Sequence, residues 1–340
     1  MTLIIETLKG RPQERAPFWF LRQAGRYMDE YREVRAQAGG FLDLVFNPEL
    51  ATEVTLQPIR RFSPDAAILF SDILVTPLAL GQDLWFEQGE GPRLTPLSEF
   101  DWRTKLDPAK AHDCLAPIYE TVERLTTALP EPVSLIGFAG SPWTVATYMV
   151  AGRGTKDQGP ARDMAYRDPE AFAEVIERLE IVTVDYLIRQ VKAGAEAVML
   201  FDSWAGVLPP DQFDLWVTQP TKRIVEKLRA AVDVPVIGFP RGGGLNLKSY
   251  LQTGVDAMHI DETVPAAWAA EHLQPHVCIQ GNLDPRLPLI GGDAMTRAAD
   301  DALQALKSGA HVVNLGHGIT PDVPPAHIEA LAAHLKSSRR

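Results

Sequence analysis

The chain has 340 residues, of which 46% are hydrophobic and 23% are charged, and its formal net charge at pH 7 is -11. This composition is typical of a folded globular protein and argues against a disordered chain. The acidic balance argues against nucleic-acid binding, which needs a basic face, although a few clustered arginines can still form a local cationic pocket.

Eight short apolar runs recur along the chain, each bounded by polar residues or glycine. Because they lack the alternation of a half-exposed strand, they are typical of strands buried on both faces in a parallel sheet. In chain order they are PFWFLR from Pro17, AAILF from Ala66, VSLIGF from Val133, AVMLF from Ala197, VPVIGF from Val234, DAMHI from Asp256, HVCIQ from His276 and HVVNL from His311.

Segments of helical period separate these runs. The stretch 169–195 follows Asp168, which can act as the N-cap before Pro169, and Gly194 can end it. A second helix from Ala294 can be capped by Asp293 and ended by Gly309. This βα repetition predicts an α/β fold, a single (β/α)8 TIM barrel over residues 1–340 with its active site at the C-terminal strand ends; an open doubly wound sheet more often has roughly five to seven strands.

Residues 81–115 interrupt the repetition. Trp85, Phe86 and several glycine and proline residues predict a β-rich or irregular insertion after the second strand. Long insertions at such positions are common as lids and functional loops.

Two arginines follow the first run. Arg22 and Arg26 stand four residues apart with Gly25 between them, so their guanidinium groups can point into one pocket. Planar guanidinium forks bind carboxylates in a bidentate manner, which predicts a ligand with several carboxylates. The alternative is a pair of surface or ion-paired arginines.

Asp72 and His317 also stand at predicted strand ends. Asp72 lies between apolar stretches in ILFSDIL, where a buried carboxylate needs a cation or several hydrogen-bond donors. It can equally be a structural cap of the following helix. His317 lies between two glycines that allow close approach of a ligand, and it can also be an ordinary loop or core histidine.

Tyr148 and Ser203 are weaker candidates. Tyr148 is predicted on a helix that follows the turn GFAGSP, and aromatic residues at helical spacing usually belong to the core. Ser203 follows a buried strand directly and can offer one hydroxyl donor or act as an N-cap.

Several kinds of chemistry lack their usual motifs. The sequence has no GxxxxGK[ST], HExxH or GxSxG pattern. Cys114 and Cys278 are isolated, which gives no support for a disulfide framework or a cysteine zinc site and favours a reduced cytoplasm. Residues 1–15 lack the features of a signal peptide, and no apolar run is long enough for a membrane-spanning helix.

Seven segments together resemble the uroporphyrinogen decarboxylase family, and the first and third resemble its two signature motifs. They are FWFLRQAGRYMDEYREVRA, FSDILVTPLALG, GFAGSPWTVATYMVAG, FDSWAG, GFPRG, GNLDP and NLGHGI, spread over residues 18–319. This chain departs from the family pattern where MDEYR lacks a proline before its glutamate, where GFAGSP has serine in place of alanine, and where FDS has aspartate in place of glutamate. These departures remove no residue expected to touch substrate.

The resemblance implies a barrel enzyme that converts the four acetate side chains of uroporphyrinogen III to methyl groups in haem biosynthesis, giving coproporphyrinogen III and carbon dioxide. It also implies a homodimer that needs no cofactor and no metal. By motif, Arg22, Arg26 and Arg35 would bind carboxylates beside Gln23, Ala24 and Gly25, Asp72 would face the pyrrole N–H groups, and Tyr148, Ser203 and His317 would complete the pocket. Arg22, Asp72 and Tyr148 would be the catalytic residues.

Two other functions remain open from the sequence. A related barrel methyltransferase would act on corrinoid proteins through zinc, yet the corresponding strand end reads GFPRG without His or Cys. A non-catalytic tetrapyrrole-binding protein would keep the barrel and bind substrate without turnover.

Overall fold

The computed structural model describes residues 1–87 and 89–339. Its main sheet is parallel and has seven strands in the order β1-β4-β5-β6-β7-β8-β9. These strands are β1 (Ala66–Ile68), β4 (Ser134–Gly140), β5 (Ala197–Asp202), β6 (Val236–Pro240), β7 (Ala257–His259), β8 (Cys278–Leu283) and β9 (His311–Leu315). Each corresponds to one of the predicted apolar runs, and β4, β6 and β9 are buried at every position, as continuous apolar runs require.

The first predicted strand needs correction. The segment from Pro17 forms a single parallel bridge, from Phe18 to Val313 of β9. On its other side the Asp65 N–H donates to the Phe18 carbonyl over 2.9 Å, just before β1 begins. The ladder stops because the Leu21 N–H donates to the Asn314 side chain and the chain then turns at Arg22, whose φ is +59°. A regular eight-stranded sheet is therefore not confirmed within the described residues.

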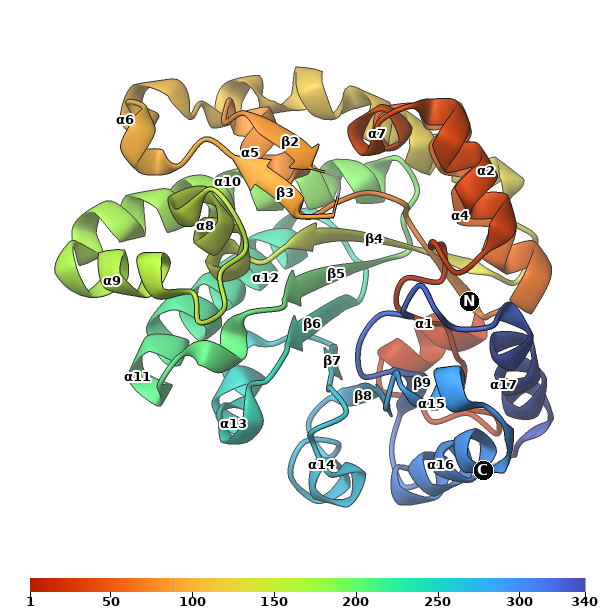
Figure 1. The fold of residues 1–340 in the computed structure, drawn as a ribbon. Helices are drawn as coiled ribbons and strands as arrows, with labels where there is room; N and C mark the ends of the chain where they lie inside the picture. Colours follow the sequence, from red (N-terminus) through yellow and green to blue (C-terminus); the bar gives the residue numbers. More distant parts are fainter. Residues whose placement is uncertain (88, 340) are drawn as a thin grey trace.

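Helices lie outside the curved sheet and follow its strands (Figure 1). Within the described ranges they are α1 (Leu3–Leu8), α2 (Asp29–Ala38), α3 (Phe41–Val45), α4 (Pro48–Phe62), α5 (Val75–Leu80), α6 (Trp102–Lys105), α7 (Ala111–Ala128), α8 (Pro142–Ala151), α9 (Gly159–Arg167), α10 (Pro169–Lys192), α11 (Pro210–Phe213), α12 (Gln219–Ala231), α13 (Leu247–Tyr250), α14 (Ala266–His272), α15 (Leu287–Ile290), α16 (Gly292–Ala305) and α17 (Pro325–Ser337). In this outer layer α4, α7, α10 and α12 pack in succession, and α17 packs against both α16 and α4. None of these helices is long and apolar enough to cross a membrane.

The predicted helix caps are confirmed in one case and wrong in the other. The Asp168 side chain accepts the Ala171 N–H at the start of α10, and Gly194 follows the helix with a φ of +120°. In α16, however, Gly291 is the N-cap and Asp293 lies in the first turn. The chain leaves α15 with a φ of +71° at Gly291, a conformation that glycine adopts without strain, so the helix begins earlier than predicted. It ends at Ala305, before Gly309.

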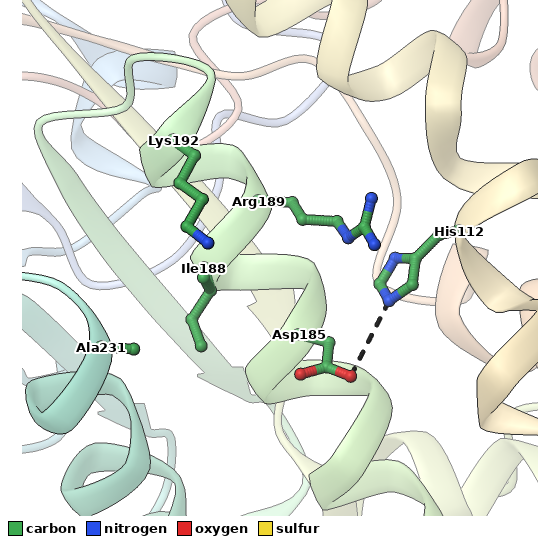
Figure 2. A pocket seen from close by; sticks show the side chains of 6 residues that line it. All are labelled: His112, Asp185, Ile188, Arg189, Lys192 and Ala231. Atoms are coloured by element: carbon green, nitrogen blue, oxygen red, sulfur yellow. Dashed lines mark ion pairs between the residues drawn. The ribbon is translucent and has the colours of Figure 1, made fainter.

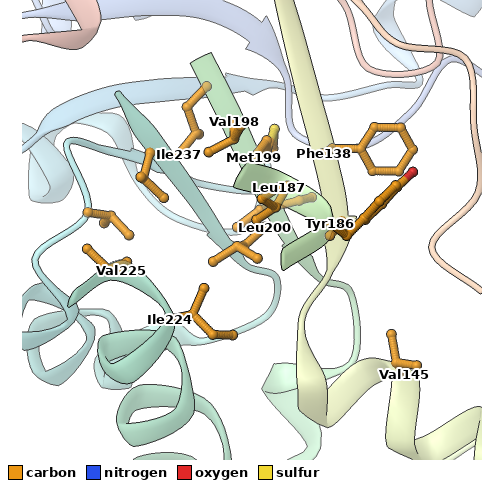
Figure 3. Packing of buried hydrophobic residues seen from close by; sticks show 14 of the residues in the cluster. Phe138, Val145, Tyr186, Leu187, Val198, Met199, Leu200, Ile224, Val225 and Ile237 are labelled. Atoms are coloured by element: carbon orange, nitrogen blue, oxygen red, sulfur yellow. The ribbon is translucent and has the colours of Figure 1, made fainter. Parts of the chain in front are cut away.

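The core lies mainly between the sheet and the outer helices. Figure 3 shows Ile224 and Val225 of α12 facing Leu200 of β5 and Ile237 of β6, all of them buried. These aliphatic contacts stabilise the sheet against α12, and they leave the strand ends available for polar side chains.

The segment 81–115 contains an antiparallel hairpin formed by β2 (Leu84–Glu87) and β3 (Gly91–Leu94), followed by short helical turns and α6. An isolated antiparallel bridge joins Arg93 to Arg153, and the Leu94 N–H donates to the Gly152 carbonyl over 2.8 Å. The hairpin is thereby attached to the loop that follows α8 (Figure 1).

Candidate active site

Polar side chains from distant parts of the chain meet at the C-terminal ends of the strands. Arg22 follows the first apolar segment, Asp72 follows β1, Tyr148 lies on α8 after β4, and His317 follows β9. Arg22 is electrostatically coupled to Asp72 and Tyr148, and His317 is coupled to Arg22. Arg241, which follows β6, couples to both Arg22 and His317. We refer to these five residues as the strand-end cluster.

Arg22 is held in place through its backbone and through Gly318. The Leu21 N–H donates to Asn314 Oδ1 over 2.9 Å, and the Leu21 carbonyl accepts the Ile319 N–H over 2.9 Å. A Cβ atom on Gly318 would lie 2.4 Å from Cδ of Arg22, so only glycine leaves room for the aliphatic part of this side chain. The Arg22 side chain is exposed, yet the protein around it partly desolvates the guanidinium and lowers its pKa, as do the neighbouring arginines, while Asp72 opposes the shift.

Asp72 has one structural contact and one electrostatic contact. Its Oδ1 accepts the Leu74 N–H over 2.8 Å, in the turn before α5. Burial raises the pKa of this carboxyl group, whereas the Leu74 donor and the charge of Arg22 lower it. The alternative of a structural helix cap is wrong, because the N-cap of α5 is Leu74 and Asp72 stabilises only the turn before it.

A buried polar link joins α8, which carries Tyr148, to the end of β5, which Ser203 follows. Thr144 Oγ1 donates to Asp202 Oδ1 over 2.5 Å and accepts the Trp204 N–H over 3.0 Å. The Tyr148 and Trp204 ring centroids are 6.5 Å apart. Ser203 lies between Asp202 and Trp204, so its backbone is fixed beside the helix that carries Tyr148.

Asp202 is a second buried carboxyl group of this region whose pKa is raised. Burial raises its pKa to about 7, although Thr144 opposes the shift. Its Oδ2 atom is buried and makes no hydrogen bond. An ionised carboxylate would be costly there, so the side chain is half protonated near neutral pH.

His317 and Arg241 form the other end of the cluster, next to Asp261. Burial, together with Arg241 and Arg22, lowers the pKa of His317 to about 4, so the imidazole is neutral at pH 7. Asp261 accepts the Gly242 N–H over 2.6 Å. Burial alone would raise the pKa of Asp261, but its donors from Thr263 and Gly242 and the charge of Arg241 lower it.

The other residues of the predicted site are placed less directly. Gln23 is buried and its amide donates to the Ala66 carbonyl over 3.4 Å, which anchors the turn to β1. Ala24 and Gly25 lie in that turn, and Arg26 is exposed and couples electrostatically to Arg22. Arg35 lies on α2, where its Nη1 donates to the Gly39 carbonyl over 2.9 Å and its guanidinium lies 5.9 Å from the Phe41 ring centroid.

Comparison with known proteins decides the family. A family model described as "Uroporphyrinogen decarboxylase (URO-D)" matches residues 1–338. A protein of Sphingopyxis alaskensis named uroporphyrinogen decarboxylase is 53% identical, over 98% of this chain and 97% of its own length. A protein of the same name from Chelativorans sp. is 52% identical, over 99% and 98%. The chain belongs to the uroporphyrinogen decarboxylase family.

Among solved structures, a methyltransferase from Methanosarcina mazei has a TM-score of 0.78 at 19% identity, over 98% of this chain and 97% of its own. At this identity the likeness shows a shared fold and gives no information on activity. A B12-independent methionine synthase from Shewanella has a TM-score of 0.57 at 9% identity. Within residues 1–87 and 89–339, no three or more His, Cys, Asp or Glu side chains are grouped so as to hold a metal ion.

Three residues lie at this site although the sequence analysis assigned them no role. Arg241 had a signal, because it directly follows a buried strand within the run PRGGG. Asp202 also stands at a strand end. Thr144 had no sequence signal, since its role depends on α8 packing against the end of β5.

A depression of about 520 Å³ on the outer helices does not include the strand-end cluster. Figure 2 shows it between α10 and its neighbours, with the His112 ring facing the Asp185 carboxylate, 3.8 Å from Nε2 to Oδ2. Burial and the charge of Arg189 lower the pKa of His112, which leaves the ring mostly neutral at pH 7 and this ion pair weak.

Proposed function

We propose that this chain decarboxylates the four acetate side chains of uroporphyrinogen III, giving coproporphyrinogen III and carbon dioxide. The observation that carries the proposal is the match of residues 1–338 to the uroporphyrinogen decarboxylase family, and the position of Asp72, Arg22 and Tyr148 at one end of the sheet supports it. The relatives that share about half of its residues bear the name of this enzyme.

The reaction needs a site for the electron pair that departing carbon dioxide leaves behind. Protonation of the pyrrole carbon that bears an acetate makes the ring cationic and able to accept that pair. The bond to the carboxyl carbon then breaks, and its electron pair forms a double bond between the exocyclic carbon and the ring. A proton added to the exocyclic carbon completes the methyl group, and the proton on the ring carbon leaves, which restores the neutral aromatic pyrrole. The substrate itself is thus the electron acceptor, and we propose that the enzyme uses no cofactor.

Asp72 is the residue that we propose to stabilise the cationic ring. Its carboxylate would accept hydrogen bonds from the pyrrole N–H groups and lie close to the charge that develops. A preorganised group of opposite charge stabilises such a transition state more than the ground state. Burial raises the pKa of Asp72 in the free protein, and a cationic ring beside it would favour the ionised form.

The arginines would hold the periphery of the substrate. We propose that Arg22, Arg26 and Arg35 bind carboxylates, since guanidinium groups form paired hydrogen bonds with them. The turn residues Gln23, Ala24 and Gly25 would shape that side of the pocket, with Ser203 and the neutral His317 supplying further polar contacts. Arg22 and Tyr148 are the groups next to Asp72 that we propose to take part in proton transfer.

We further propose that residues 1–340 form one barrel domain with an insertion at about 81–115. The hydrogen bonds of the first apolar segment support its closure of the barrel: Pro17 and Trp19 bond to Val313 of β9 on one side, and the Phe18 carbonyl accepts the Asp65 N–H on the other. We also propose a cytoplasmic homodimer that binds neither nucleic acid nor a membrane.

Anaerobic incubation of the purified protein with reduced uroporphyrinogen III tests the function. Chromatography of the oxidised products should show porphyrins with seven, six, five and finally four carboxylates. Binding of the substrate without loss of carboxylates would instead support a tetrapyrrole-binding protein. Inactivity together with stoichiometric zinc in the purified protein would favour the methyltransferase.

A further inference from the structure

A second depression, of about 550 Å³, opens beside Tyr148. The β2–β3 hairpin lines one side of it, and the loop Arg153–Lys156, which follows α8, lines the other. This loop passes close to the phenol, because a Cβ atom on Gly154 would lie 3.5 Å from Cε1 of Tyr148 and 3.8 Å from its hydroxyl oxygen. Tyr148 therefore borders both this depression and the strand-end cluster.

Backbone contacts hold the two sides of the depression together. The Leu94 N–H donates to the Gly152 carbonyl over 2.8 Å, and Arg93 bridges to Arg153. Gly152 has a φ of +70°, and a Cβ atom there would lie 2.7 Å from the Leu94 carbonyl oxygen. The hairpin and the loop can approach this closely only because residue 152 is glycine. Their contact also determines the position of the Arg153 backbone, from which the side chain extends.

The charges in this depression do not cancel. Arg93 is neutralised by two carboxylates, with 3.1 Å from its Nε to Glu87 Oε2 and a second pairing with Glu90. Arg153 and Lys156 form no ion pair with the described residues and are exposed. Although the net charge of the chain is -11, the side chains of Arg153 and Lys156 thus provide two positive charges in the depression that Tyr148 lines.

We propose that Arg153 and Lys156 form a binding subsite for a carboxylate of the tetrapyrrole that does not react. The inference rests on the proposed function, under which the substrate carries eight carboxylates, four as acetates and four as propionates. A reacting acetate must lie near Asp72, and the subsite lies where Tyr148 borders the loop. We assign the carboxylate bound there to a propionate, because the four propionates persist through every step and stay on the product, whereas each acetate is lost in turn.

The test uses the full-length double variant Arg153→Gln/Lys156→Gln and its two single variants. We expect the double variant to raise KM for uroporphyrinogen III by roughly three- to tenfold, because exposed ion pairs are individually modest, while kcat changes less than twofold. The inhibition constant of added coproporphyrinogen should rise by a similar factor, since the product keeps its propionates. Added salt should raise KM less in the variant than in the wild type.

A matched control replaces two exposed cations elsewhere that form no ion pair with the described residues, in Lys222→Gln/Lys227→Gln, and should leave both constants unchanged. If the wild type turns over but neither constant moves in the double variant, the subsite is rejected and the proposed function stands. A fall in kcat at constant KM would also reject it, because the loop would then act by positioning Tyr148. Lack of turnover in the wild type would reject both proposals.

Discussion

Arg22 and Gly318 occupy one narrow space at the strand ends, where a methyl group on the glycine would lie 2.4 Å from Cδ of the arginine. Gly318 immediately follows His317, so β9 and the first apolar segment determine together where the guanidinium lies. The position of a charged group is thus controlled by a residue that carries no charge.

We expect Gly318→Ala to displace Arg22 and to raise KM by roughly three- to thirtyfold, because overpacking a tight contact forces side chains from their preferred positions. Steady-state kinetics with uroporphyrinogen III would measure the change. In an Arg22→Ala background the glycine substitution should add little, since the side chain that it displaces is gone. Equal effects in both backgrounds would show that Gly318 acts independently of Arg22.

Asp72→Asn should lower kcat by about 10²–10³-fold while the fold is retained, because an amide cannot balance a cationic ring. The amide oxygen can still accept the Leu74 N–H, so the turn before α5 is kept. Single-turnover rates and the thermal midpoint should be measured together. A variant that keeps near wild-type turnover would mean that Asp72 only shapes this turn.

His317 should have little influence on the pH dependence of activity above pH 6, because its pKa in the folded protein is about 4. The unfolded chain binds the proton with a pKa of about 6.5, so stability falls as pH drops from that value toward 4. His317→Gln should recover about 1–2 kcal/mol of this loss at pH 4, measured by urea unfolding. An identical slope of stability against pH in variant and wild type would contradict the lowered pKa.

Asp202 should affect stability in the opposite direction, because its pKa is raised to about 7 in the fold. Its contribution to the free energy of unfolding is fully present below about pH 3.9, the pKa of an aspartate in the unfolded chain. That contribution is lost as the pH rises through about 7. The difference in free energy of unfolding between Asp202→Asn and the wild type should therefore shift in favour of the variant by roughly 2–4 kcal/mol from pH 4 to pH 8. Paired unfolding curves at the two pH values would show it, and a constant difference would count against the shift.

Thr144→Val should lower kcat by about tenfold, because it removes both the donor to Asp202 and the acceptor for the Trp204 N–H, and thereby loosens the link between α8, which carries Tyr148, and the end of β5. Thr144→Ser, which keeps the hydroxyl group, should restore most of the activity. Failure of the serine variant to do so would assign the effect to packing by the threonine methyl group.

The local features of the fold could be predicted from the order of the residues. Buried apolar runs identified seven strands because burial on both faces leaves a continuous pattern. Asp168 identified the start of α10 because an N-cap acts on the N–H groups next to it. The long motifs identified the family, and the order of residues alone made Arg22, Asp72 and His317 candidates, because each follows an apolar run directly.

Features that depend on partners far apart in the chain could not be predicted in this way. The first apolar segment leaves the ladder after one bridge because Asn314, far along the chain, accepts the Leu21 N–H. The Asp293 cap failed because Gly291 turns the chain first. Thr144, Asp202 and Arg241 join the site through contacts between elements far apart in sequence. Periodicity and capping report each residue's neighbours in the chain, whereas electrostatic coupling and long-range hydrogen bonds depend on distances that exist only once the chain has folded.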